Sequence, residues 1–371
     1  MLVGFLALAG LAAAAAWLYP AIRFIRLTQK GVYSPSSRFA AGPQIDVPEA
    51  GIAIRLYGNP AVCSSTLVLL PGLHPNGVHD PRYQAFAQTC ARAGFLVVAP
   101  DIQAFREFRI ETETVDQLLC LIEALPAHLP AGSLQNLGLF GVSYAAGIAF
   151  LIAARKPEKI NFLVSVGGYG DLSRAIDFGL TGFHPERKQI ASQPPQEWIR
   201  MIFAFNFAEK LTPPRDGDLL REILLLRLNL KEDKAGEKEA GLSQEGKQFL
   251  NLIMNGIPEN EFERFRAILR ERADFFRNLS PETVLSNLDA HLRIILLHGR
   301  NDDLIPYEET LEILRRLSGH AHVHSCITSS LTHVDAKGAE DLLGAFRLFL
   351  WVRTLMSEVT TKTRRRKESR K

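Results

Sequence analysis

Cysteine is scarce in this sequence, and its spacing excludes two kinds of site. The four cysteines among the 371 residues are Cys63, Cys90, Cys120 and Cys326, with no two close together. Structural zinc sites and dithiol redox motifs require cysteines a few residues apart. The sequence therefore contains neither motif. The pattern predicts buried thiols and is compatible with a reducing cytosol.

Basic charge is concentrated at one end of the chain and is not interleaved with aromatic residues. The net charge is +3, but residues 362–371 hold seven basic residues and one acid, which leaves 36 basic and 39 acidic residues elsewhere. Nucleic-acid surfaces usually combine basic patches with aromatic side chains, so we expect no nucleic-acid partner. The basic tail, residues 359–371, either contacts anionic lipid head groups or is simply solvated.

The amino terminus has no charged side chain from Met1 to Ile22, and Trp17 and Tyr19 lie near the end of this apolar run. As a helix it would reach about 33 Å, close to the thickness of the hydrocarbon core of a bilayer. Basic residues follow the run and none precedes it. This order favours an uncleaved anchor over residues 1–27, with the rest of the chain on the cytoplasmic side of the cell membrane. The alternative is export after cleavage of a signal peptide.

The strongest chemical signal surrounds Ser143, in Gly141-Val142-Ser143-Tyr144-Ala145, directly after the apolar run from Leu137 to Phe140. A strand that enters a tight turn of small residues and then a helix exposes a serine hydroxyl at the strand's carboxyl end. Taken alone, such a serine is more often an ordinary helix cap. Its candidate partners therefore decide between the two interpretations.

Two further residues follow predicted strands in the order that a hydrolytic triad requires. Asp302 comes after the apolar run 294–297 and the pair His298-Gly299, and His333 comes after the strand-like stretch 321–327. Three residues of these types, each following a predicted strand, favour joint catalysis over three unrelated polar positions. Asp303 is interpreted as a neighbour of the acid, and Asp171 as the second choice for the acid.

These motifs resemble the nucleophile elbow and the His-Gly-x-x-Asp signature of the alpha/beta-hydrolase family, with Ala145 in place of the usual second glycine of the elbow. The resemblance implies Ser143 as nucleophile, Asp302 as acid and His333 as base. It also implies an oxyanion hole formed by the backbone N–H groups of Leu73 and Tyr144, and it requires no metal or organic cofactor. His74, His79 and Asp80 could line the same opening.

The rest of the pattern predicts an α/β fold, with a mostly parallel sheet covered by helices on both faces. Residues 28–43 are expected to form a linker, and residues 44–358 the catalytic domain. Within it, an insertion of about 120 residues, 171–290, is expected to form a helical cap, because Trp198, Phe203, Phe265 and neighbouring apolar residues recur at helical spacing. Most of these side chains should form the cap's own core. The charged stretch 231–239 is expected to be a solvated loop.

The function expected from this constellation is hydrolysis of carboxylic esters with acyl or lipid-like groups through an acyl-enzyme intermediate. Carboxylesterase and lipase activities are favoured over peptidase and thioesterase activities. The alternative is an inactive scaffold of the same fold that acts as a membrane-associated binding protein. The expected partners are a small ester substrate and the membrane, and the sequence does not define an oligomeric state.

Overall fold

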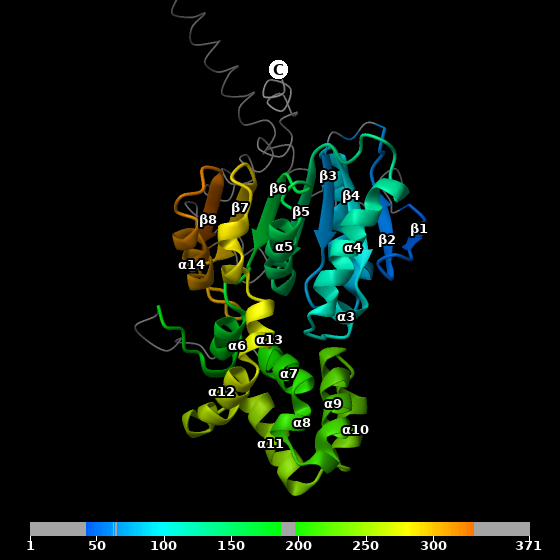
Figure 1. The fold of residues 1–371 in the computed structure, drawn as a ribbon. Coiled ribbons are helices and arrows are strands. Elements are labelled where there is room, and N and C mark those ends of the chain that lie inside the picture. Colours follow the sequence, from blue (N-terminus) through cyan, green and yellow to red (C-terminus); the bar gives the residue numbers. More distant parts are fainter. Residues whose placement is uncertain (1–41, 62, 64, 187–196, 330–371) are drawn as a thin grey trace, which may run out of the picture.

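The computed structural model describes residues 42–61, 63, 65–186 and 197–329. Its centre is an eight-stranded sheet in the order β1-β2-β4-β3-β5-β6-β7-β8 (Figure 1). β2 pairs antiparallel with β1 and β4, and the pairings from β4 to β8 are parallel. The strands are β1 (Gln44–Val47), β2 (Ile52–Tyr57), β3 (Ser65–Leu70), β4 (Phe95–Asp101), β5 (Leu137–Val142), β6 (Phe162–Val166), β7 (Arg293–Gly299) and β8 (Val323–Thr328).

Both faces of the sheet are covered, as its continuous apolar strands predict. Alternate residues of each strand point to opposite faces, so Leu67 and Leu69 pack with α2 (Pro81–Arg92). Val68 and Leu70 instead belong to the core that contains α4 (Glu113–His128) and α5 (Tyr144–Arg155). Helix α14 (Glu308–Arg316) follows β7 and contributes Ile313 to the same core. The short α3 (Gln103–Arg106) and the 3₁₀ turn η2 (Gly77–His79) lie in the loops near the strand ends.

Helices fill the long connection between β6 and β7 and lie beyond the carboxyl ends of the strands (Figure 1). We refer to residues 171–290 as the cap. Its helices are α6 (Leu172–Thr181), α7 (Glu197–Asn206), α8 (Ala208–Leu211), α9 (Pro214–Leu228), α10 (Glu232–Glu239), α11 (Gln244–Asn255), α12 (Phe262–Glu271) and α13 (Ala273–Asn278), with 3₁₀ turns η3 (Glu259–Glu261), η4 (Pro281–Thr283) and η5 (Leu285–Asn287).

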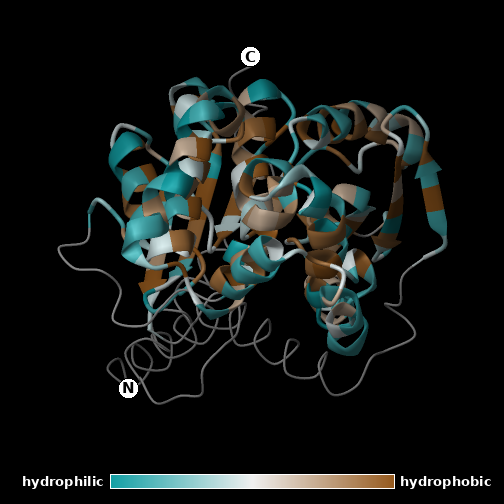
Figure 2. Ribbon diagram, turned by 90° about the horizontal axis from the view of Figure 1, so that it is seen from below, coloured by the Kyte–Doolittle hydropathy of each residue, from teal (hydrophilic) through white to brown (hydrophobic). Residues whose placement is uncertain are grey.

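Aromatic side chains form much of the cap's interior. Phe203 lies 5.0 Å from Phe207 and 6.2 Å from Phe265 between ring centroids, and Phe207 lies 5.7 Å from Phe276. Figure 2 views the molecule from the cap side. Apolar residues are concentrated towards the interior of the molecule, and hydrophilic residues lie around them. An insertion of this size needs such a core to offset the entropy lost on ordering.

The expectation of a solvated loop at 231–239 is wrong, because residues 232–239 form α10. Ala235 is fully buried, and Arg227 of α9 makes ion pairs with both Glu232 and Glu239. These contacts with α9 stabilise a helix that the charged sequence alone does not indicate. The prediction of buried thiols also fails in part, since Cys120 is exposed and Cys63 is half-buried, whereas Cys90 and Cys326 are buried.

The predicted anchor, residues 1–27, and the basic tail, residues 359–371, lie outside the described residues. So do all but the last two residues of the predicted linker. Among the residues that the structure does describe, none of the helices has the length and apolar character needed to cross a bilayer.

Candidate active site

Ser143 occupies a strained turn between β5 and α5. Its backbone φ of 56° and ψ of −127° lie outside the regions that side-chain-bearing residues usually adopt. The Ser143 N–H donates to the carbonyl of Val166 at 2.9 Å, and its own carbonyl accepts from the Ala146 N–H at 3.0 Å. These bonds hold the serine at the carboxyl end of β5, where α5 begins.

Gly141 is required because α5 passes directly over the end of β5. A Cβ at this position would lie 2.5 Å from the carbonyl oxygen of Ala145 and 2.6 Å from the Cα of Ala146. Both are backbone atoms that cannot move without displacing the helix. Ala145 itself is fully buried, in agreement with the need for a small residue at the position where the usual pattern has glycine.

The loop formed by residues 71–80, which we call the oxyanion loop, runs alongside this turn. A Cβ built on Gly72 would lie 3.8 Å from the Cβ of Ser143, so the adjoining Leu73 is near the serine. The other predicted donor, Tyr144, is the first residue of α5, where backbone N–H groups lack helical partners. Its ring is held between Phe105 at 5.5 Å and Tyr169 at 6.2 Å.

Polar contacts position the oxyanion loop. The His74 N–H donates to the carbonyl of Phe105 at 3.3 Å. His79 Nε2 lies 3.4 Å from Asp101 Oδ2, and Asp101 also pairs with Arg106 at 2.9 Å. Burial lowers the pKa of His74, and the nearby Asp80 only partly opposes this effect. Of the three polar residues predicted at the opening, His74 and Asp80 line the cavity described below, and His79 instead faces Asp101.

Asp302 lies in residues 299–306, which we call the acid loop, at the carboxyl end of β7. The carboxylate is buried, and its Oδ1 accepts from the N–H groups of Leu304 and Ile305, both at 2.9 Å. His298 lies beneath it. Its Nε2 is 2.9 Å from the carbonyl of Ile305 and 3.3 Å from Asp302 Oδ2, and its Nδ1 is 2.7 Å from Thr310 Oγ1. The histidine therefore supports the acid loop.

A cavity of about 620 Å³ opens beside Ser143 and extends towards the cap. On the cap side its wall is apolar, with Leu172 and Ile176 from α6 and Trp198, Ile199 and Ile202 from α7. Leu304 and Ile305 of the acid loop, together with Leu73 and Tyr144, also line it. An apolar cavity beside a few converging polar groups is the usual form of a small-molecule site.

A family model described as the alpha/beta hydrolase fold matches residues 65–339. The chain belongs to the alpha/beta-hydrolase family. The chain has the mostly parallel sheet, covered by helices, that the sequence pattern predicts. A search of curated proteins gives no match.

Several solved structures are similar to this chain at low sequence identity. An acylaminoacyl peptidase of Pyrococcus horikoshii has a TM-score of 0.51 and 12% identity, covering 90% of this chain and 43% of that one. A putative dipeptidyl aminopeptidase IV of Bacteroides ovatus has a TM-score of 0.52 and 12% identity, covering 89% and 37%. A membrane phospholipase A, described as a bacterial virulence factor, has a TM-score of 0.44 and 18% identity, covering 95% and 98%. The chain spans about two fifths of the length of the peptidase chains.

Of the remaining predicted site residues, the structure describes Asp171 and Asp303. His333 lies outside the described residues, so its role stays a prediction. Asp171, the second choice for the acid, caps α6 by accepting from the Arg174 N–H at 2.7 Å, and it does not line the cavity beside Ser143. Asp303 adjoins Asp302 in the acid loop.

Among the described residues, no group of three or more His, Cys, Asp or Glu side chains is arranged to hold a metal ion. Several buried polar residues near the candidate site are not identified by the sequence motifs. His298 stands in the His-Gly signature and could have been found there. Arg174, His184 and Glu309 form a network next to the acid loop, and no motif indicates them.

Proposed function

We propose that this hydrolase cleaves carboxylic esters of apolar acyl groups, with Ser143 as nucleophile, His333 as base and Asp302 as acid. The observation that carries the proposal is the strained turn that holds Ser143 at the edge of an apolar cavity. A serine with φ of 56° is costly to maintain, and such strain is concentrated at functional sites.

In the proposed reaction the Ser143 oxygen attacks the carbonyl carbon of the ester while His333 takes the hydroxyl proton. The N–H groups of Leu73 and Tyr144 stabilise the negative oxygen of the tetrahedral intermediate. The alcohol then leaves with the proton from His333. Water, deprotonated by His333, attacks the acyl-enzyme. As the carboxylic acid leaves, the Ser143 oxygen takes this proton back from His333, which restores both residues. Asp302 keeps the imidazole in the required tautomer throughout.

The wall of the cavity supports an apolar acyl group as the preferred substrate portion. On the cap side, α6 and α7 contribute Leu172, Ile176, Trp198, Ile199 and Ile202 without a charged side chain among them. Burying each methylene of an acyl chain against such a wall contributes about 0.8 kcal/mol. A charged acyl group would lose its hydration with no partner on this wall. We therefore propose medium or long aliphatic esters over charged ones.

Filling the cap side of the cavity is expected to shift chain-length preference towards short esters. Ile202 is 8% exposed and lies in the wall on α7. A tryptophan at this position would occupy space that a long acyl chain needs, so Ile202→Trp should lower kcat/KM for a dodecanoyl ester by about tenfold or more. Hydrolysis of the acetyl ester should change by about twofold or less. The measurement is a p-nitrophenyl ester series from two to twelve carbons.

The control for this substitution is Leu311→Trp, because Leu311 is 44% exposed on α14 and does not line the cavity. It should leave the chain-length profile unchanged. If Ile202→Trp lowers all esters equally, the cap wall does not hold the acyl group. If the unaltered protein hydrolyses no ester of the series, the proposed ester hydrolysis is refuted.

We also propose that residues 1–27 anchor the hydrolase in the cell membrane, with the catalytic domain on the cytoplasmic side. The support is the uncharged run Met1–Ile22 followed directly by Arg23 and Arg26. In intact cells, protease added outside should leave the catalytic domain uncut, and the hydrolase should sediment with membranes. Digestion by external protease would contradict the proposed side, and release of a shortened chain would indicate a cleaved signal peptide.

A further inference from the structure

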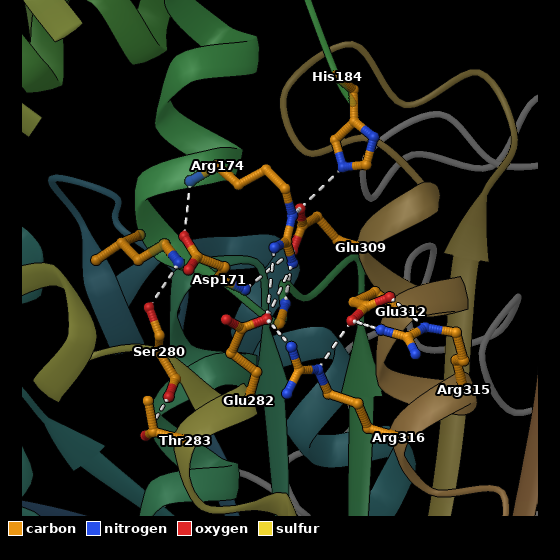
Figure 3. Close-up of polar contacts among 12 residues, drawn as sticks. Asp171, Arg174, His184, Ser280, Glu282, Thr283, Glu309, Glu312, Arg315 and Arg316 are labelled. Carbon is orange, nitrogen blue, oxygen red and sulfur yellow. Dashed lines mark hydrogen bonds and ion pairs between the residues drawn. The ribbon is translucent and has the colours of Figure 1, made fainter. Parts of the chain in front are cut away.

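Glu309 connects the catalytic domain to the first part of the cap. Its side chain is fully buried in the first turn of α14. Oε2 accepts from the backbone N–H groups of Gly170 at 2.9 Å and Asp171 at 3.0 Å, at the point where the chain enters the cap. Arg174 of α6 donates to both oxygens, with Nε at 2.5 Å and Nη2 at 3.0 Å (Figure 3).

The same carboxylate also contacts the segment that follows α6. His184 is fully buried, and its Nε2 lies 3.0 Å from Glu309 Oε1. The His184 Nδ1 accepts from the N–H of Glu186 at 3.2 Å, which assigns the proton to Nε2 and makes it the donor to Glu309. One carboxylate therefore contacts the chain both before and after α6.

The contacts of Glu309 and Arg174 stabilise the charged form of each side chain. Burial opposes ionisation of Glu309, but hydrogen bonds from His184 and Arg174 lower its pKa overall. Burial likewise opposes the charged form of Arg174, and its contact with Glu309 nevertheless raises its pKa. Glu309 and Arg174 are therefore an ion pair at neutral pH. Breaking one partner of such a buried pair leaves the other charge without compensation.

Arg174 also reaches the end of the cap where the chain returns to the sheet. Its Nη2 lies 3.3 Å from Glu282 Oε2 in η4, and the Glu282 N–H donates to the carbonyl of Gly170 at 2.9 Å. Nearby, Ser280 Oγ accepts from the Leu172 N–H at 2.9 Å (Figure 3). Both connections between the cap and the sheet thus meet around the Glu309–Arg174 pair.

Helix α6 is the element that this network holds and that also lines the cavity. Arg174 lies on α6, and Leu172, Ala175 and Ile176 of the same helix face the cavity beside Ser143. Helix α7 packs closely on α6, since a Cβ at Gly179 would lie 2.2 Å from Ile199 Cγ2. A shift of α6 would therefore move both helices that form the apolar wall.

We propose that Glu309 is a positioning residue that sets the cap's apolar wall against Ser143 and thereby determines which acyl chains the hydrolase accepts. The inference rests on the proposed ester hydrolysis. Glu309 does not line the cavity and acts through Arg174, the Gly170–Asp171 backbone and His184. Hydrolysis of short esters, whose acyl groups contact little of the cap wall, depends weakly on Glu309. Hydrolysis of long esters depends strongly on Glu309.

The test compares Glu309→Gln with Glu113→Gln in the full-length protein. Glu113 also lies in the first turn of a helix of the catalytic domain, α4, but it is exposed and does not line the cavity. Glutamine keeps the size of Glu309 and removes its charge. KM for the dodecanoyl ester should rise by about tenfold, while kcat/KM for the acetyl ester should stay within about twofold. Glu113→Gln should keep the profile of the unaltered protein.

A purely structural role would give a different result. Loss of folded protein lowers the rate with acetyl and dodecanoyl esters by the same factor, so a uniform decrease overturns the inference, as does an unchanged profile. If Glu309→Gln does not fold, Arg174→Lys decides, because lysine keeps the charge but cannot bridge Glu309 and Glu282 with a planar fork. A loss confined to long esters supports the inference, and the unaltered profile overturns it. Absence of ester hydrolysis in the unaltered protein refutes the proposed function itself.

Discussion

Replacement of Ser143 by alanine is expected to lower ester hydrolysis by roughly 10⁴-fold or more, because the proposed acyl-enzyme forms on the Ser143 hydroxyl. Alanine keeps the Cβ of serine, and its backbone can still donate to the carbonyl of Val166 and accept from the N–H of Ala146. The fold should therefore persist, with an unfolding temperature within a few degrees of the unaltered protein. Initial rates with a short ester and a thermal melt provide the two measurements.

The matched control is Ser286→Ala, an exposed serine in η5 outside the cavity, which should retain full activity. If Ser143→Ala retains more than about a tenth of the activity, the assignment of the nucleophile fails, since removal of a nucleophile costs far more than tenfold. If Ser143→Ala is inactive and has also lost its near-ultraviolet circular dichroism, the variant is misfolded and does not test the nucleophile. The Ser143→Cys variant is then tested instead, by its labelling with thiol-reactive esters.

Asp302→Asn should give the second large effect, a decrease in kcat of about 10⁴-fold with little change in folding. Asparagine Oδ1 can still accept from the N–H groups of Leu304 and Ile305, so the acid loop should keep its shape. What is lost is the negative charge that stabilises the protonated imidazole of the proposed base, His333. The measurement is kcat with a saturating short ester across a pH series.

Two carboxylates serve as controls for this assignment. Asp303→Asn changes the neighbouring residue of the acid loop, and Asp171→Asn changes the N-cap of α6, the second choice for the acid. Each should reduce kcat by less than about tenfold, because neither is expected to orient the base. A 10⁴-fold loss in Asp171→Asn together with an active Asp302→Asn would transfer the acid role to Asp171.

The strands and the turn at Ser143 could be predicted because both depend on local sequence. Continuous apolar runs indicated the buried parallel strands, and Gly141 followed by Ser143 indicated the tight turn that the structure places between β5 and α5. The order of Ser143 and Asp302 after their strands likewise places both at the carboxyl edge of the sheet. The family resemblance supplied the interpretation of these positions, and the roles of Ser143, Asp302 and His333 stay predictions.

Features that depend on distant contacts could not be predicted. The charged segment 232–239 is helical because Arg227 pairs with two of its glutamates and Ala235 is buried, neither of which a charge count shows. Glu309 appears in the sequence as one acid beside another, Glu308. Its partners Gly170, Arg174 and His184 are more than 120 residues away in the chain. Only the fold brings them together.

The most direct test of the central claim is mass spectrometry of the protein after reaction with a fluorophosphonate, which reacts readily with activated serine hydroxyls. The account predicts one adduct per chain on the peptide that contains Ser143, and no adduct in Ser143→Ala. An unmodified protein, or an adduct on any other serine that persists in Ser143→Ala, would contradict it.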